Sequence, residues 1–377
     1  MRARECHDPH PIPLIMPDST LPHAPLSRSD HSRWPHARER VAILAVALAS
    51  TSVFGNVARA QVAVAAQAAA GVGECAAQGL AQDACGYASD IFVLTAPQMI
   101  GALGGGAHLL ALPGGKKSRF SLGLRASVVD GLVPNISERS MELGPGSPAP
   151  VTTSRQVVGA PVVDVGMSVY TGRQLEVGSL GQGRMGAIHI LSSFSYLPDV
   201  EMGDFTLSMP DRNWRATWGA RVGLLEGVSR LPDISATYLQ RGLPTMDMSL
   251  MVDEDSISLG QMRGTSTGWR VIASKSVSVL GLAVGMGRDQ AAYSARISTA
   301  LNDPDNAGWI RSSPLEVRRS TSRSSLFGSA VLSLGPIGLT TEVGRVGRIG
   351  IATTNPIVGV QPGEAQTYGS AGLRVKF

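Results

Sequence analysis

Few residues of this sequence have the type and spacing that catalysis requires. His189 lies in AIHILSSFSY, a stretch of alternating polarity, and shares its predicted face with Ser193 and Ser195. A serine and a histidine on neighbouring strands are the groups that nucleophilic catalysis uses. A hydrogen-bonded histidine in a wall of side chains is the simpler interpretation. After residue 60 the chain holds only His108 and His189, so we predict that it is not an enzyme.

Acidic and glycine-rich stretches offer two further candidates. Residues 253–255 and 303–306 supply the oxygen ligands that Ca²⁺ takes, although solvated acidic loop tips are more common. Residues 181–186 match the dinucleotide pattern GxGxxG, but they precede a predicted strand and do not join a strand to a helix. We therefore predict neither a metal ion nor a cofactor.

Charged residues recur at the polar positions of segments in which polarity alternates. In 213–225, Trp, Ala, Val and Leu alternate with Arg, Thr and Gly, which is typical of a strand with one apolar face. Similar alternation runs through most of the chain after residue 118 and is interrupted near 288–296. The titratable residues on the polar face are Arg125, Asp164, His189, Arg215, Arg221, Arg270, Glu342, Arg374 and Lys376.

The segments that carry this pattern predict an all-β fold. Connections counted back from the C-terminus alternate between long and short, as in transmembrane barrels, and a soluble sandwich has no reason for this alternation. We predict an antiparallel up-and-down transmembrane β-barrel of about ten strands, and a hairpin across 113–118 would make twelve. The predicted strands are 119–129, 160–171, 185–197, 213–225, 233–250, 257–276, 279–299, 323–334, 337–347 and 366–377.

The first 60 residues form an N-terminal extension and a signal peptide. An apolar run at 41–54 follows Arg38 and Arg40 and precedes Ala58-Arg59-Ala60, which predicts cleavage after Ala60. Fourteen residues are too few to span about 30 Å of hydrocarbon, so this run is not a membrane anchor. Half of the formal net charge of +4 lies in this removed part, and the +2 that remains gives no argument for nucleic-acid binding.

A second segment, 61–118, separates the leader from the barrel at 119–377. It is rich in Ala and Gly and shows some helical spacing of apolar residues, so we expect a partly helical segment, either periplasmic or inserted in the lumen. Cys75 and Cys85 lie ten residues apart in this exported part, and we expect a disulfide between them. Two buried thiols are the alternative.

The C-terminal residues, QTYGSAGLRVKF, end in Phe377, and Leu373 and Val375 precede it at alternate positions. This resembles the closing strand of Gram-negative outer-membrane β-barrel proteins. The resemblance implies a location in the bacterial cell outer membrane, contact with its lipid, and recognition of Leu373, Val375 and Phe377 by the barrel-assembly machinery. Arginines between 311 and 323 would have lipopolysaccharide phosphates as their natural partner.

The charges on the predicted inner face indicate two functions of different kinds. Bases outnumber acids there, and rings of Arg or Lys select anions in pores, so we predict a monomeric passive pore or transporter for small solutes with a preference for anions. A ten-strand interior is, however, hardly wider than one that side chains fill. In that alternative the arginines pair with acids, and the barrel is structural, adhesive or lipid-organising, with a filled lumen.

Deletion of Phe377 tests the assembly signal. We expect the truncated chain to insert poorly, because the resemblance assigns this residue to recognition during insertion and not to the stability of a formed barrel. The amount of heat-modifiable protein in outer-membrane fractions measures the effect. Normal levels of a heat-modifiable truncated protein would contradict the assignment.

Overall fold

The computed structural model describes residues 74–104, 119–135, 141–176, 181–202, 204–228, 230–305, 308–359, 361 and 363–377. The chain divides into two units, Met1–Gln61 and Val62–Phe377, and all described residues belong to the second. The predicted signal peptide lies outside the described residues, as do residues 61–73 and 105–118 of the predicted helical segment.

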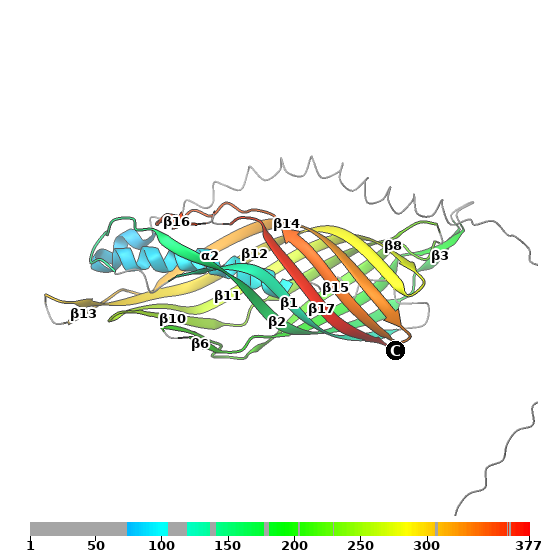
Figure 1. Ribbon diagram of the computed structural model, residues 1–377, viewed down its shortest axis with the longest axis horizontal. Helices are drawn as coiled ribbons and strands as arrows, with labels where there is room; N and C mark the ends of the chain where they lie inside the picture. The colour runs from blue at the N-terminus through cyan, green and yellow to red at the C-terminus, as the bar shows by residue number, and fades with distance from the viewer. Residues whose placement is uncertain are drawn as a thin grey trace, which may run out of the picture. The chain divides into compact units, whose positions relative to one another are not determined.

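Ten strands form a closed ring in chain order (Figure 1). Each strand pairs antiparallel with the next, and the last strand pairs with the first, so that Arg125 lies opposite Gly372 across the closing seam. The predicted fold class, an antiparallel up-and-down barrel of ten strands with an N-terminal helix, is confirmed. The ring consists of β1 (Phe120–Pro134), β2 (Val151–Tyr170), β5 (Ala187–Tyr196), β8 (Trp214–Leu225), β9 (Asp233–Gly242), β11 (Asp255–Val277), β12 (Leu280–Asp303), β14 (Leu315–Leu334), β15 (Ile337–Val346) and β17 (Gln366–Lys376).

The connections distinguish a turn end and a loop end of the ring. At the turn end, two-residue turns join β11 to β12 and β14 to β15, and the rings of Phe120 and Phe377 lie 6.0 Å apart. The hairpin of β3 (Arg173–Glu176) and β4 (Gln182–Met185), between β2 and β5, also belongs to this end. The loop end carries β6 (Val200–Met202), β7 (Phe205–Ser208), β10 (Met246–Val252), β13 (Gly308–Arg311) and β16 (Ile357–Val358).

Several segments predicted as loops are extensions of barrel strands. Residues 300–322 lie between the predicted strands 279–299 and 323–334, but β12 continues to Asp303 and β14 begins at Leu315. Similarly, β1 continues to Pro134 and β2 begins at Val151. The extensions of β1 and β2 pair with each other, residues 315–322 of β14 pair with 290–297 of β12, and residues 300–303 of β12 pair with β13. This pairing satisfies backbone hydrogen bonds there.

Polar side chains lie inside the ring and apolar side chains lie outside it. On β1, Leu122 and Leu124 are exposed on the outer face, whereas Arg125 and Ser127 are buried inside. Aromatic side chains on the outer face pair between β5 and β8, with Tyr196 and Trp214 ring centroids 5.1 Å apart. We call the apolar outer face of the ten strands the apolar belt. Its polarity is the reverse of that of a soluble protein.

Strand β12 shows where the apolar belt ends. Its outward residues are apolar at Leu280, Leu282, Val284 and Met286 and become polar from Arg288 onward. Its inward residues change in the opposite sense, to a buried set of Tyr293, Ala295 and Ile297. The interruption of alternation near 288–296 therefore marks the point at which the strand leaves the belt and begins to enclose an apolar core.

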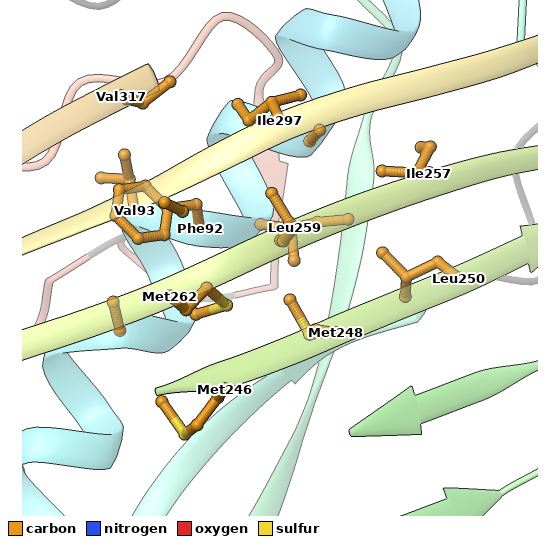
Figure 2. Close-up of a cluster of buried hydrophobic side chains, with 14 of the residues drawn as sticks. Phe92, Val93, Met246, Met248, Leu250, Ile257, Leu259, Met262, Ile297 and Val317 are labelled. Atoms are coloured by element: carbon orange, nitrogen blue, oxygen red, sulfur yellow. The ribbon is translucent and has the colours of Figure 1, made fainter. Parts of the chain in front are cut away.

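This loop-end core surrounds a helix (Figure 2). The 3-10 turn η2 (Glu74–Ala81) leads into helix α2 (Gln82–Gly104), and no described helix is both long and apolar enough to cross a bilayer. Phe92 of α2 packs edge-on against Tyr293 at 5.5 Å. A bulge at Gln261, whose φ is 51°, reverses the phase of β11, so that Leu259 and Met262 both face the core.

Glycine lets bulky inward side chains and neighbouring strands approach closely. Gly372 lies at the closing seam, where an added Cβ would be 2.5 Å from the Leu124 carbonyl oxygen and 2.8 Å from Arg125 Cα. Neither of these is a mobile side-chain atom, so a methyl group would push β17 away from β1. Gly369, which faces outward on the same strand, would meet no described atom closer than 3.7 Å.

Substitution of Gly372 tests this packing at the seam. We expect Gly372→Ala to lower the free energy of unfolding by about 1–3 kcal/mol, the usual effect of overpacking. The matched substitution Gly369→Ala should change it by less than about 0.5 kcal/mol. Denaturant unfolding followed by tryptophan fluorescence measures both, and equal losses in the two variants would contradict the seam argument.

Candidate functional site in the barrel lumen

The strand registers place the predicted inner-face residues on the inside of the ring. Arg125 and Asp164 form a buried ion pair between β1 and β2, with Arg125 Nε 2.6 Å from Asp164 Oδ2. The Ser193 hydroxyl donates to Asp164 Oδ1 at 2.5 Å. This serine, predicted to share a face with His189, is therefore hydrogen-bonded to a carboxylate on a neighbouring strand. No hydrogen bond between it and the histidine occurs in the described part of the chain.

His189 and Arg221 face each other across β5 and β8. Arg221 Nη2 lies 2.9 Å from Glu226 Oε1, and both side chains are buried. Glu226 was not among the predicted site residues, because it lies in the turn after β8, where alternation gives no signal. Arg215 faces the position of Gly242, where an added Cβ would be 2.9 Å from Arg215 Nε.

The centre of the lumen holds a second ionic cluster. Asp289 accepts hydrogen bonds from Arg241 Nη1 at 2.9 Å and from Arg270 Nη1 and Nη2 at 2.9 and 2.6 Å. Nearby, Arg323 Nη1 donates to Gln366 Oε1 at 2.7 Å, and Tyr368 is hydrogen-bonded to Glu342.

Of this cluster, the sequence predicted Arg270 and Glu342 but missed Arg241 and Asp289. Arg323 was grouped with the arginines expected to contact lipopolysaccharide, but it is buried and lines the cavity. Asp289 lies at the limit of the apolar belt, where the alternation that identified inward positions becomes irregular. Counting every second residue along β9, β12 and β14, from the part of each strand where polarity alternates regularly, would have placed Arg241, Asp289 and Arg323 inside the ring.

Basic side chains outnumber acids inside the ring. Leaving aside the loop-end extensions, the basic residues at described inward positions are Arg125, Arg215, Arg221, Arg241, Arg270, Arg323, Arg374 and Lys376. The acidic residues at such positions are Asp164, Asp233, Asp289 and Glu342, and Glu226 joins them from its turn. The lumen is therefore positively charged, although several of its arginines are paired.

Helix α2 extends from the loop end into the lumen. The Gln98 side chain accepts a hydrogen bond from the Leu132 backbone N–H and donates to the Leu132 carbonyl at 2.9 Å. Pro97 and Gly101 lie over a cavity whose other walls include Arg270 and Tyr368. In the described residues the lumen is thus covered from the loop end by the helix.

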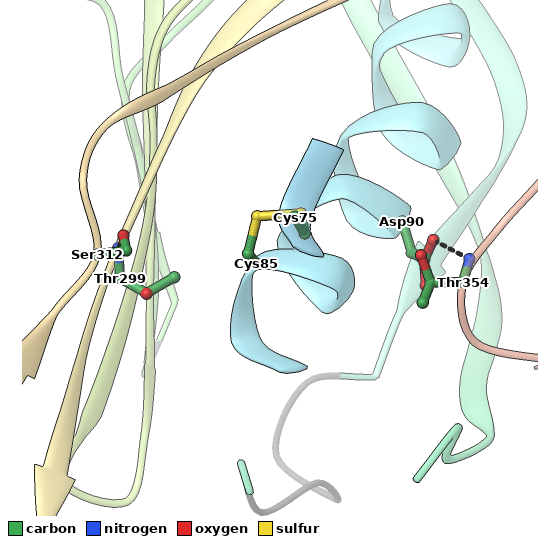
Figure 3. The surroundings of a disulfide bond; sticks show 6 residues. All are labelled: Cys75, Cys85, Asp90, Thr299, Ser312 and Thr354. Atoms are coloured by element: carbon green, nitrogen blue, oxygen red, sulfur yellow. Dashed lines mark hydrogen bonds between the residues drawn. A yellow bond between two sulfur atoms is a disulfide. The ribbon is translucent and has the colours of Figure 1, made fainter. Parts of the chain in front are cut away.

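Loops at the same end hold the helix (Figure 3). The buried carboxylate of Asp90 accepts hydrogen bonds from the backbone N–H groups of Thr354 and Asn355, at 2.7 and 2.8 Å, and from the Asn355 amide. Cys75 and Cys85 are joined by a disulfide that ties η2 to the first turns of α2. The loop between β15 and β17, which we call the outer loop, thus holds the helix chiefly through the Asp90 side chain.

The C-terminal strand places its predicted signal residues on the outer face. Leu373 and Phe377 are exposed there, and Val375 is half-buried. The described residues contain no group of three or more His, Cys, Asp or Glu side chains that could hold a metal ion.

Known proteins resemble this chain in structure but not in sequence. No protein-family model and no curated protein matches the sequence. Neisserial surface protein A is 13% identical, with 68% of this chain and 97% of that chain covered and a TM-score of 0.23. The transport unit of the autotransporter AIDA-I from Escherichia coli is 10% identical, with 78% and 98% covered and a TM-score of 0.28. The Pseudomonas putida toluene transporter TodX is 10% identical, with 72% and 93% covered and a TM-score of 0.30.

These three structures are bacterial outer-membrane β-barrel proteins. At such identities and scores, the function of this chain has to be argued from its own residues.

Replacement of Asp289 tests the central ionic cluster. We expect Asp289→Asn to lower the free energy of unfolding by about 3–5 kcal/mol, because it leaves Arg241 and Arg270 buried without their counter-ion. The control is Asp130→Asn at the exposed Arg155–Asp130 pair, where side-chain exposures of 51% and 39% predict a change of at most about 1 kcal/mol. Denaturant unfolding compares the two, and similar small losses would show that the cluster is not a buried ionic network.

Proposed function

We propose that this chain is an outer-membrane β-barrel that provides a gated path for small anionic solutes, with helix α2 as the gate. The proposal has three parts, namely the position in the membrane, the charge of the path and the closure by the helix. The observation that carries it is the excess of inward arginines in a ring whose outer face is apolar.

The apolar belt supports the position in the membrane. On β1, apolar residues alternate outward over residues 120–128, which at about 2.5 Å of axial rise per tilted residue covers about 22 Å. Outer-membrane barrels have an apolar band about 25 Å tall, short periplasmic turns and longer extracellular loops. In this proposal the turn end is periplasmic and the loop end faces outward.

The inward charges support selection of anions. A ring of guanidinium groups in a low-dielectric wall creates a positive potential that attracts anions and repels cations. Arg221, Arg374 and Lys376 lie toward the turn end, and the central cluster lies above them, so basic groups line successive levels of the lumen.

The contacts of α2 support a gate at the loop end. The helix covers the central cavity, and its polar attachments to the wall and loops are made at Asp83, Asp90 and Gln98. Displacement of α2 would uncover the cluster of arginines beneath it.

The filled-lumen alternative is favoured by a different observation. Tyr87, Ile91, Phe92 and Val93 of α2 are fully or nearly fully buried in the loop-end core. Exposing such side chains costs about 1.5–3 kcal/mol each, which would keep the helix permanently in place. In that case the barrel would have a structural, adhesive or lipid-organising function.

Conductance in planar bilayers separates the two functions. We expect the wild-type barrel to open rarely and Asp90→Ala to open at least tenfold more often, because this variant removes the acceptor that fixes α2 to the outer loop. Under a KCl gradient the open state should show a reversal potential of the sign expected for anions, and Arg374→Gln should weaken that preference.

Asp130→Asn, on the outer surface, serves as the control and should match the wild type. Heat-modifiability on gels verifies that each variant is folded. A folded Asp90→Ala barrel that never conducts would favour the structural alternative, and an open state selective for cations would contradict the proposed charge preference.

A further inference from the structure

We propose that the cavity beneath α2 is a binding site for a small oxyanion, a phosphate or carboxylate group. The choice of an anionic ligand rests on the proposed function, but binding of that ligand can be measured in experiments that do not depend on conduction. The cavity lies where Arg241 of β9, Arg270 of β11, Arg323 of β14 and Tyr368 of β17 converge, and Pro97 and Gly101 of α2 cover it.

The walls of this cavity present more hydrogen-bond donors than the described residues can satisfy. Arg241 Nε and Nη2, Arg270 Nε and Arg323 Nε have no hydrogen-bond acceptor among the described residues. The hydroxyls of Ser266 and Ser325, which also line the cavity, have no partner there either. All five side chains are buried, with exposures between 2% and 7%.

Guanidinium groups can only donate hydrogen bonds, so these arginines require acceptors. Three side-chain acceptors next to these arginines and Tyr368 already take part in hydrogen bonds. Asp289 receives Arg241 and Arg270, Gln366 receives Arg323, and Glu342 is bound to Tyr368. A buried donor without an acceptor destabilises the protein by about 1–3 kcal/mol, and by more when it is charged. A ligand that is rich in acceptors would remove this penalty.

The charge of the cluster selects a ligand with a single negative charge. Three guanidinium groups face two carboxylates, Asp289 and Glu342, which leaves one positive charge uncompensated. The C-terminal end of α2 contributes a partial charge of about −0.5, which reduces but does not cancel this excess. An oxyanion supplies both the charge and several acceptor oxygens, and forked guanidinium groups bind such groups in a bidentate manner.

The first test is phosphate binding by the purified, folded barrel in detergent. We expect sodium phosphate to raise the midpoint of thermal unfolding in a saturable manner, because a ligand that binds only the folded state stabilises it by mass action. Isothermal titration calorimetry measures the dissociation constant directly. Sodium chloride at matched ionic strength should produce a smaller and non-saturating change. An equal effect of chloride, or no saturable effect of phosphate, would overturn the proposal.

Two serines provide a variant that keeps every charge. Ser266→Ala combined with Ser325→Ala removes the two hydroxyl donors and should weaken phosphate binding about tenfold. The matched control combines Ser274→Ala with Ser329→Ala, two buried inward serines on the same strands that do not line the cavity. The control should bind phosphate like the wild type. If both double variants bind phosphate equally, the cavity is not the site.

Arg323→Gln adds a test of the charge and should lower phosphate affinity at least tenfold. Arg374→Gln, which changes a buried inward arginine toward the turn end, should not lower it.

The failures of the two proposals are distinguishable. If the barrel binds phosphate at this cavity but never conducts, the binding site is supported and the gated path is contradicted. If the barrel conducts anions but shows no saturable phosphate binding, only the binding site is contradicted.

Discussion

Pairing between β17 and β1 is the interaction on which the other features of this structure depend. Once the last strand hydrogen-bonds to the first, no barrel strand at the level of the belt has a free edge. The backbone polar groups are then satisfied within the ring, and the outer face can be wholly apolar. Charged side chains have only the interior left to them. The buried pair of Arg125 and Asp164, directly beside the seam, follows from this constraint.

The interior in turn determines where small and large residues occur. A narrow ring cannot hold an arginine or a tyrosine at every inward position, so glycine faces many of the large side chains. Gly344 lies beneath the ring of Tyr368, and Gly268 and Gly287 lie beside the central ionic cluster. This explains a chain with 44 glycines that nevertheless forms long regular strands. Beyond the belt the same strands exchange their polar and apolar faces and form an ordinary hydrophobic core around α2.

The strand order, the ring closure and the inward charges near the turn end could be predicted from the sequence, because alternation is a local property that each strand reports independently. The partners of those charges could not be predicted. Glu226 comes from a turn, and the contact of Asp90 with Thr354 joins residues 264 positions apart. Asp289 can be placed inside by counting along β12, but its pairing with Arg270 depends on the register between β11 and β12. A bulge such as that at Gln261 reverses the phase of a strand without any clear compositional signal. The position of α2 could not be decided from the sequence either, because its apolar residues fit a periplasmic helix and a helix inserted in the lumen equally well.

The direction of α2 bears on how the chain is assembled. Gln98 contacts Leu132 near the loop end of β1, whereas β1 begins at the turn end, where Phe120 lies against Phe377. Helix α2 is therefore enclosed by strands that follow it in the chain, with contacts to β1, β2, β11, β12 and β14. If the ring closed before α2 was in place, the helix and the disulfide-linked segment from Cys75 to Cys85 would have to pass into a ring that was already closed. Closure of β17 onto β1 around a helix already in place requires no such passage, so the final seam acts as the step that traps the helix.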